Sequence, residues 1–157
     1  MTDVSPMPEA GEKAPGFSGM DQHGNAVSLD DFRGRKVVLY FYPKDDTPGC
    51  TKQACNLRDG QGVLKAKGIA VVGVSGDSVK SHGKFADKYD LPFPLIADED
   101  LEIIKRYGVY GEKNFYGVKS FGIKRTTFLI DEEGTILHVF KKPKTGEHTQ
   151  EILGKLN

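Results

Sequence analysis

Two apolar runs with a helical segment between them constrain the fold of this chain most strongly. The runs cover 37–42 (VVLYFY) and 69–75 (IAVVGVS), and both are rich in β-branched or aromatic residues without polar alternation. Such runs are typical of strands that are buried on both faces of a sheet. Between them, apolar residues recur at helical spacing from Cys50 to about Lys67, with no proline. A strand, a helix and a strand in this order predict a βαβ crossover and therefore a parallel pair of strands.

The rest of the chain continues the alternation of strands and helices. The predicted elements are a helix over 79–89 capped by Asp77 or Ser78, a strand over 93–97, a helix over 98–107 ended by Gly108, strands over 126–130 and 135–140 that form a hairpin with a glycine in its turn, and a helix over 147–156. Together they predict an α/β, three-layer fold with a mixed central sheet and helices on both faces. This order of elements resembles the thioredoxin-like fold.

Length and charge narrow the classes of protein to which the chain can belong. Its 157 residues predict one domain over 1–157, with residues 1–13 as a flexible N-terminal arm. The 22 basic and 22 acidic residues leave no net charge, so we expect neither nucleic acid nor a membrane surface as partner. The proline-containing N-terminus has no apolar core typical of a secretory signal, and no apolar run approaches the roughly 18 residues that span a bilayer. We therefore expect a cytoplasmic protein.

The chain contains two cysteines, Cys50 and Cys55. A cytosolic chain that is large enough to bury a core does not need a structural disulfide. Redox catalysis, metal ligation and two inert buried thiols are the three interpretations of the pair. No Cys or His pair has zinc-finger spacing, which disfavours the metal, and a thioredoxin-type disulfide reductase would need two residues between its cysteines rather than four.

The position of Cys50 favours redox chemistry. Pro43 ends the first strand, Thr47 can cap the helix that follows, and Pro48 suits its first position, so Cys50 lies in the first helical turn. A free cysteine with a pKa of about 8.5 is only about 3% thiolate at neutral pH, and a helix N-terminus favours the thiolate.

The residues around Cys50 argue against the alternative of a small buried hydrophobe. None of the neighbours is typical of a core: they are Gly49, Thr51, Lys52 and Gln53. The four histidines are scattered, and we expect each to be a surface or capping residue without a catalytic role: His23, His82, His138 and His148.

The loop that precedes Cys50 resembles a known active site. The segment 41–51 (FYPKDDTPGCT) resembles the PxxxTxxC loop of peroxiredoxins, and the longer string FYPKDDTPGCTKQAC is similar to the bacterioferritin comigratory protein or peroxiredoxin Q branch. Further similarity lies in GEKAPGF, in DQHGNAVSLDDFRGRKVVLYFYP and in RTTFLIDEEG, so that the resemblance covers nearly the whole chain. It implies a thiol peroxidase that reduces hydrogen peroxide and organic hydroperoxides.

The resemblance also implies roles for individual residues. Cys50 would attack the terminal peroxide oxygen as the peroxidatic thiolate, and Thr47 would hydrogen-bond through its hydroxyl. Pro43 would shield the sulfur, and Arg125 would support the thiolate and the breaking O–O bond. Because one oxygen departs with growing negative charge, a fixed cation stabilises the transition state more than the ground state. Without the resemblance, a surface ion pair at the start of a strand is an equal interpretation of Arg125.

Cys55 is the resolving cysteine that the resemblance implies. Residues five apart on an ideal helix have Cα atoms about 8.6 Å apart, whereas a disulfide needs at most about 6.8 Å, so the first turns would have to unwind. The alternative is a passive Cys55, with the reductant attacking the sulfenic acid directly. Thioredoxin or a similar dithiol is the expected reductant; we expect no cofactor, no metal, and a monomer or at most a weak dimer.

Overall fold

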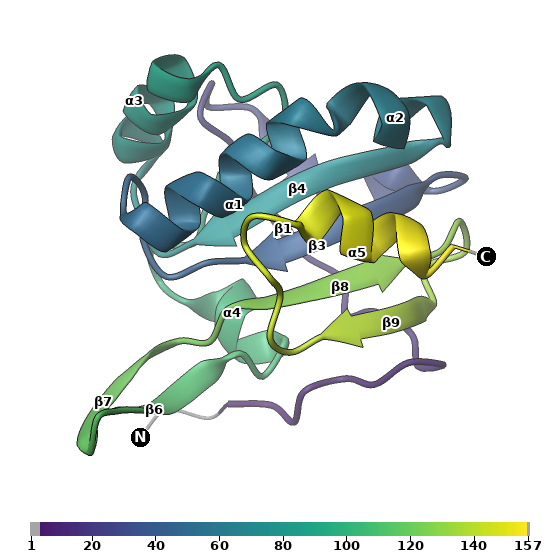
Figure 1. The fold of residues 1–157 in the computed structure, drawn as a ribbon. Helices are drawn as coiled ribbons and strands as arrows, with labels where there is room; N and C mark the ends of the chain where they lie inside the picture. Colours follow the sequence, from purple (N-terminus) through teal and green to yellow (C-terminus); the bar gives the residue numbers. More distant parts are fainter. Residues whose placement is uncertain (1–3, 157) are drawn as a thin grey trace.

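The computed structural model describes residues 4–156 and contains a seven-stranded mixed sheet (Figure 1). The strand order is β2-β1-β5-β4-β3-β8-β9; β3 pairs in parallel with β4 and β4 with β5, whereas the other pairs are antiparallel. The bounds are β1 Ser18–Met20, β2 Ala26–Ser28, β3 Lys36–Phe41, β4 Ile69–Ser75, β5 Leu95–Ala97, β8 Thr126–Ile130 and β9 Ile136–Phe140.

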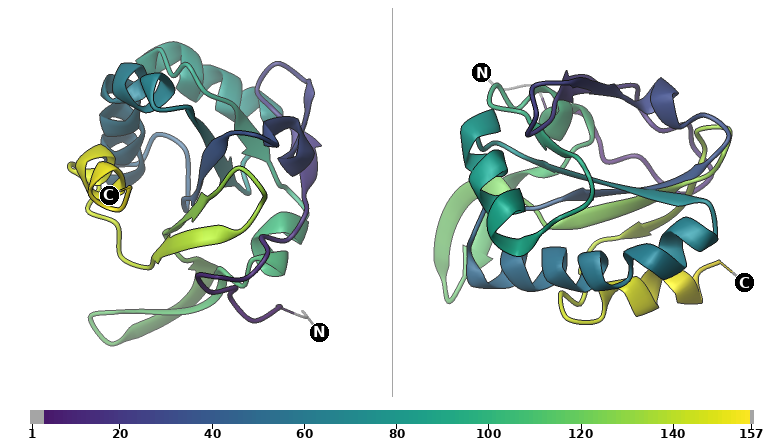
Figure 2. Two further views of the ribbon diagram at one scale, coloured as in Figure 1. Left: turned by 90° about the vertical axis from the view of Figure 1, so that its right-hand side faces the viewer. Right: turned by 90° about the horizontal axis from the view of Figure 1, so that it is seen from above.

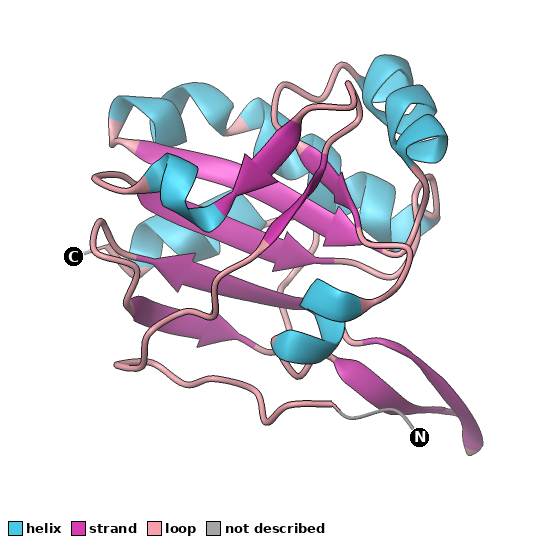
Figure 3. Ribbon diagram, turned by 180° about the vertical axis from the view of Figure 1, so that it is seen from behind, coloured by secondary structure: helices cyan, strands magenta, loops and turns pink. Residues whose placement is uncertain are grey.

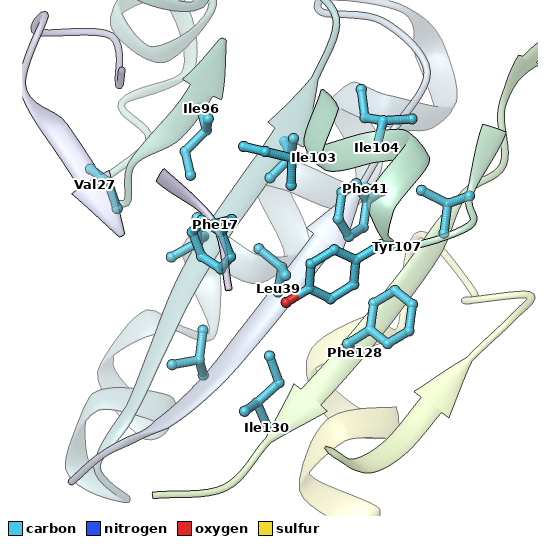
Figure 4. Close-up of a cluster of buried hydrophobic side chains, with 14 of the residues drawn as sticks. Phe17, Val27, Leu39, Phe41, Ile96, Ile103, Ile104, Tyr107, Phe128 and Ile130 are labelled. Atoms are coloured by element: carbon cyan, nitrogen blue, oxygen red, sulfur yellow. The ribbon is translucent and has the colours of Figure 1, made fainter. Parts of the chain in front are cut away.

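Helices cover both faces of this sheet, as predicted (Figure 2). On one face lie α1 Pro48–Asp59, α2 Gln61–Ala66, α3 Val79–Tyr89 and α5 His148–Gly154; on the other lie α4 Glu102–Arg106 and the short 3-10 helix η1 Leu29–Phe32. Figure 4 shows the core of the second face, where Tyr107 packs between Phe41 and Phe128. Strands β3, β4 and β8 are therefore buried on both sides, which explains their unbroken apolar sequences.

The βαβ crossover is confirmed, but the predicted helix from Cys50 to Lys67 is wrong in one respect. It is two helices, because the chain leaves the helical path at Gly60. A Cβ at this position would lie 2.3 Å from the Thr149 side chain of α5. The break lets α5 pack closely against α1, a contact that the periodicity of the segment alone does not reveal.

The predicted helix over 98–107 is also shorter in the structure, where α4 covers only Glu102–Arg106. Asp98 instead follows β5 and accepts a hydrogen bond from the backbone N–H of Ile104 at 2.8 Å. Leu101 adopts a left-handed φ of 61°, which is incompatible with a continuous helix across the segment. Gly108 follows α4 with a φ of +69°, as expected for a helix end.

Two hairpins were not predicted. Strands β1 and β2 form the first at one edge of the sheet, and β6 Tyr110–Phe115 with β7 Val118–Ile123 forms a separate two-stranded sheet. The second hairpin projects from the rest of the molecule (Figures 1 and 3). Its turn at Tyr116 and Gly117 has positive φ at both residues, the conformation of a tight hairpin turn. Tyrosine rarely adopts this conformation, so the turn lacks the Asn-Gly or Asp-Gly pair that would have predicted it.

The N-terminal segment from Val4 onward lies along the body of the protein. Its backbone N–H groups at Ser5 and Gly11 donate to the carbonyls of Lys105 and Ile136 at 3.0 and 2.8 Å. Among residues 4–156, no helix is both long and apolar enough to cross a membrane.

Candidate active site

Cys50 lies where the sequence predicted, at the start of α1. Strand β3 ends at Phe41, a short loop follows, and Thr47 is the N-cap residue with Pro48 at the first helical position. The Thr47 side chain does not cap the helix; its Oγ1 donates to the carbonyl of Lys44 at 2.9 Å. The hydroxyl oxygen therefore keeps its lone pairs available as acceptors beside the first turn.

The structure brings Arg125 to the sulfur of Cys50. The guanidinium Nη2 donates to Cys50 Sγ at 3.2 Å, although the two residues lie 75 positions apart. Strand β8 makes this contact possible, because it runs antiparallel to β3 with Thr126 opposite Phe41. Arg125 therefore lies beside the loop that leads to Cys50. A fixed positive charge is thus in direct contact with the sulfur of a cysteine that is only 1% exposed.

Gln53 is a site residue that the sequence interpretation placed wrongly. The sequence interpretation counted it among residues that do not belong to the core, but it is fully buried, and its Oε1 accepts a hydrogen bond from Arg125 Nη1 at 2.6 Å. Since Gln53 lies three residues after Cys50 on α1, both residues face the same guanidinium. The spacing of three residues indicated that Gln53 and Cys50 share one face of the helix. The sequence did not show that Arg125 lies opposite that face.

Gly49 has a steric role at this site. A Cβ at this position would lie 3.1 Å from Arg125 Nη2, closer than most such contacts allow. The absence of a side chain thus gives the guanidinium room to reach the sulfur.

Cys55 is half-buried on α1, and both thiols are free in the structure. The helix is continuous through both positions, so the two cysteines are separated by the regular helical geometry. Pro43 is half-buried and follows the buried Tyr42 at the end of β3, in the loop that leads to Cys50.

Two tyrosines just before the active-site loop are buried in the same cluster as Cys50. Tyr40 and Tyr42 are fully buried, with ring centroids 5.4 Å apart. Burial raises the pKa of both phenols well above the usual range, and for Tyr40 the charge of Cys50 adds to the effect. Both hydroxyls therefore stay protonated. Among the described residues, the Tyr40 hydroxyl has no hydrogen-bond partner.

The expectation that all four histidines are surface or capping residues is wrong for two of them. His82 and His148 are fully buried. His82 contacts the active-site loop through Asp45, with 2.7 Å between Nδ1 and Oδ2. His148 lies between Thr127 of β8 and Glu151, at 2.8 and 2.9 Å. Both histidines lie on the buried face of a helix beside apolar residues. Treating histidine as a possible core residue when reading the helical periodicity would have predicted their burial.

Comparison with known proteins gives a consistent result. Residues 10–139 match the AhpC/TSA family. Peroxiredoxin Bcp of Escherichia coli K12 is 48% identical over 148 residues, which cover 94% of this chain and 95% of that protein. The crystal structure of a mutant of Xylella fastidiosa PrxQ superimposes with a TM-score of 0.88 at 34% identity, covering 97% of this chain and 96% of that one. A structure of the Xanthomonas campestris bacterioferritin comigratory protein, from work on its alkyl peroxide reduction activity, has a TM-score of 0.82 at 36% identity over 88% of both chains.

Proposed function

Since the chain belongs to the AhpC/TSA family, as a peroxiredoxin of the Bcp and PrxQ branch, we propose that its thiol peroxidase activity depends on Cys50. The observation that carries this assignment is the 3.2 Å hydrogen bond from Arg125 Nη2 to Cys50 Sγ. It supplies a fixed positive charge at the one buried thiol that begins a helix. Hydrogen peroxide and organic hydroperoxides are the substrates, the latter in keeping with the alkyl peroxide reduction activity of the Xanthomonas campestris relative.

In the first step the Cys50 thiolate attacks the terminal oxygen of the hydroperoxide. A bond forms between the sulfur and that terminal oxygen, the O–O bond breaks, and the other oxygen, which carries the alkyl group or hydrogen, leaves as an alkoxide or hydroxide that takes a proton. Arg125 stabilises the negative charge as it moves from sulfur to the leaving oxygen. Thr47 Oγ1 donates to the Lys44 carbonyl, so it can accept a hydrogen bond from the peroxide O–H and orient it. Pro43 shields the sulfur from bulk water.

In the second step Cys55 attacks the sulfur of the Cys50 sulfenic acid, and water leaves as the disulfide forms. The ideal-helix separation of about 8.6 Å exceeds disulfide dimensions, so α1 unwinds between the two residues first. A dithiol reductant of the thioredoxin type then reduces the disulfide by two exchanges and restores both thiols. This cycle fits a reducing compartment, for which we propose the cytoplasm, and it needs neither a cofactor nor an oligomer.

The test of this function is mass spectrometry after one equivalent of hydrogen peroxide. We expect one disulfide between Cys50 and Cys55 in the native chain, and a sulfenic acid on Cys50 in Cys55→Ser. Cys50→Ser is expected to lose peroxide consumption altogether, because an alcohol has no equivalent of the thiolate. Substantial turnover by Cys50→Ser would overturn the assignment of Cys50, and a native chain without disulfide would overturn that of Cys55.

A further inference from the structure

A buried polar cluster lies beneath the active-site loop, and the proposed peroxidase cycle does not use it. We define the loop anchor as Asp45, Asp77 and His82. Asp45 belongs to the loop itself, Asp77 follows β4, and His82 lies on α3. Asp45 and His82 are 8% and 0% exposed, which is unusual for ionisable side chains unless they are paired. The anchor therefore connects the active-site loop to two elements of the core.

The carboxyl group of Asp45 takes part in three side-chain hydrogen bonds. Oδ1 accepts from the Tyr42 hydroxyl at 2.6 Å, and Oδ2 accepts from the Ser81 hydroxyl and lies 2.7 Å from His82 Nδ1. The two carboxyl oxygens have enough hydrogen-bonding capacity for all three partners at once, so this buried side chain is fully satisfied.

His82 connects Asp45 to the core through both of its ring nitrogens. Its Nε2 lies 3.0 Å from the backbone carbonyl of Ile96, which can only accept, and its Nδ1 faces the Asp45 carboxylate. Nε2 therefore donates to Ile96, and the 2.7 Å contact between Nδ1 and Asp45 Oδ2 is a buried hydrogen bond with one proton between the two atoms. A cation site is a competing interpretation, because Asp45, Asp77 and His82 offer ligand atoms within 4.8 Å of one another. The proton between Nδ1 and Oδ2 occupies the lone pairs that would face a metal, so the hydrogen bonds favour the anchor.

Asp77 holds the same loop by its backbone. Its Oδ2 accepts from the backbone N–H of Asp45 at 2.8 Å and is itself fixed by the Ser75 hydroxyl at 2.7 Å. The N–H of Asp45 and the C=O of Lys44 are the two ends of one peptide group. That carbonyl is the acceptor for the Thr47 hydroxyl at 2.9 Å. Because the peptide group is planar, the hydrogen bond from Asp45 N–H to Asp77 also fixes the Lys44 carbonyl. The carbonyl in turn orients the Thr47 hydroxyl, which contacts the peroxide in the proposed mechanism.

From this geometry we propose that Asp45, Asp77 and His82 are positioning residues for the first oxidation step. They hold the 44–45 peptide group at a set orientation, so the Thr47 hydroxyl donates to Lys44 and turns its lone pairs toward the substrate. They act on the peroxide and not on the sulfur, whose charge is stabilised separately by Arg125. The inference rests on the proposed peroxidase function and extends it to residues outside the loop motif.

The experiment compares two reactions of the same thiol in the Cys55→Ser background. Oxidation by hydrogen peroxide depends on Thr47, whereas alkylation by iodoacetamide depends on the Cys50 thiolate alone. We expect Asp45→Ala to lower the second-order rate constant with peroxide by about tenfold or more, the scale of a small misplacement of a reacting group. The alkylation rate constant is expected to change by less than about twofold, because Arg125 and the start of the helix are intact.

Asp45→Asn is the matched control. Its amide can donate to His82 Nδ1 while Nε2–H still donates to Ile96, so the loop stays attached to α3. We expect it to recover most of the peroxide rate that Asp45→Ala loses. Should Asp45→Ala not fold, Asp77→Ala, at a half-buried residue that follows β4, gives the same comparison.

A double-mutant cycle with Thr47→Val decides whether the anchor acts through the hydroxyl. If it does, Asp45→Ala adds almost nothing to the peroxide defect of Thr47→Val. Multiplicative defects in the double variant, or equal losses in the peroxide and alkylation reactions, would overturn the inference. A parent Cys55→Ser chain that reacts with peroxide no faster than a small-molecule thiol would instead overturn the proposed function, so the two failures are distinguishable.

Discussion

Arg125 and its contacts connect the active site to the rest of the sheet. Its two terminal nitrogens have separate partners, Cys50 Sγ and Gln53 Oε1, which hold the planar guanidinium in one orientation. A lysine has a single nitrogen and could not satisfy both partners with the same geometry. The bidentate arrangement therefore selects arginine for reasons other than charge.

We expect Arg125→Met to keep the fold but to slow the oxidation of Cys50 by peroxide by roughly 10²-fold, the usual effect of losing one charge-stabilising donor. Quenched-flow mass spectrometry of the sulfenic acid measures the rate. Arg125→Lys is the matched control. Its rate constant should lie between those of the native chain and Arg125→Met, because lysine keeps the charge but not the contact with Gln53. An unchanged rate in Arg125→Met would leave the residue with a structural role only.

Helix α1 carries Cys50 near its N-terminal end and is held by α5 near its C-terminal end. Its last turn is fixed to the N-terminus of α5 through Asn56, whose side chain donates to the carbonyl of Gly146 at 2.9 Å and accepts from the backbone N–H of Thr149 at 2.7 Å. The Thr149 hydroxyl also donates to the carbonyl of Asn56 at 3.0 Å. These bonds begin one residue after Cys55, so they mark the point at which unwinding would stop.

Formation of the Cys50–Cys55 disulfide is therefore expected to raise amide hydrogen exchange from Thr47 to Cys55, while α1 beyond Asn56 keeps its protection. Each broken helical hydrogen bond costs only about 0.5–1.5 kcal/mol net, so local opening is accessible. Exchange mass spectrometry of the reduced and oxidised chain measures this, with β3 and β8 as protected references. Unchanged exchange across α1 in a disulfide-containing chain would contradict the unwinding mechanism.

Asn56→Ala tests the proposed limit of the unwinding. Without the two side-chain hydrogen bonds of Asn56, increased exchange in the oxidised chain should extend toward Gly60. Asn56→Asp is the closest control, since it keeps the acceptor for Thr149 and loses only the donor to Gly146. An identical exchange pattern in all three chains would show that the α5 contact does not set the limit.

For the whole molecule, His148 links stability to pH. Burial lowers the pKa of this side chain, although Glu151 opposes the effect. The neutral ring also fits its contacts, because Nδ1–H can donate to Glu151 while Nε2 accepts from Thr127. The unfolded chain thus takes up the proton more readily than the folded one, so the contribution of His148 to stability is present above its unfolded pKa and is lost as the pH falls.

We expect the free energy of unfolding to fall as the pH is lowered from about 7.5 to about 5.5, a range that spans the unfolded histidine pKa of about 6.5. His148→Gln should be less stable at the upper pH but should lose less on acidification. Urea unfolding at each pH provides the measurement. The difference between the two chains cancels the contribution of His138, whose pKa is also lowered by burial. Parallel losses in both chains would rule out His148 as the source.

Local sequence patterns predicted the elements whose bounds are set by neighbouring residues. The bounds of β4 and α3 agree with the predicted segments, including Ser78 as the cap that accepts from the N–H of Ser81. Periodicity failed where a distant segment decided the outcome, as at Gly60, where Thr149 of α5 comes too close for a side chain. The hairpin of β6 and β7 was missed because its strands form a separate sheet and have few of the buried apolar positions that identify the central strands.

The mixed α/β fold and the place of Cys50 in the first turn of a helix follow from the amino-acid sequence, because strand burial, proline positions and helix starts are properties of neighbouring residues. The sequence also carried the resemblance on which the roles of Thr47, Pro43, Cys55 and Arg125 depend. The folded chain was needed to show that Arg125 contacts the sulfur, that Gln53 is buried against Arg125, and that His82 supports the loop from α3. These contacts join residues 37 to 75 positions apart, and strand pairing and helix packing, which no local pattern encodes, bring them together.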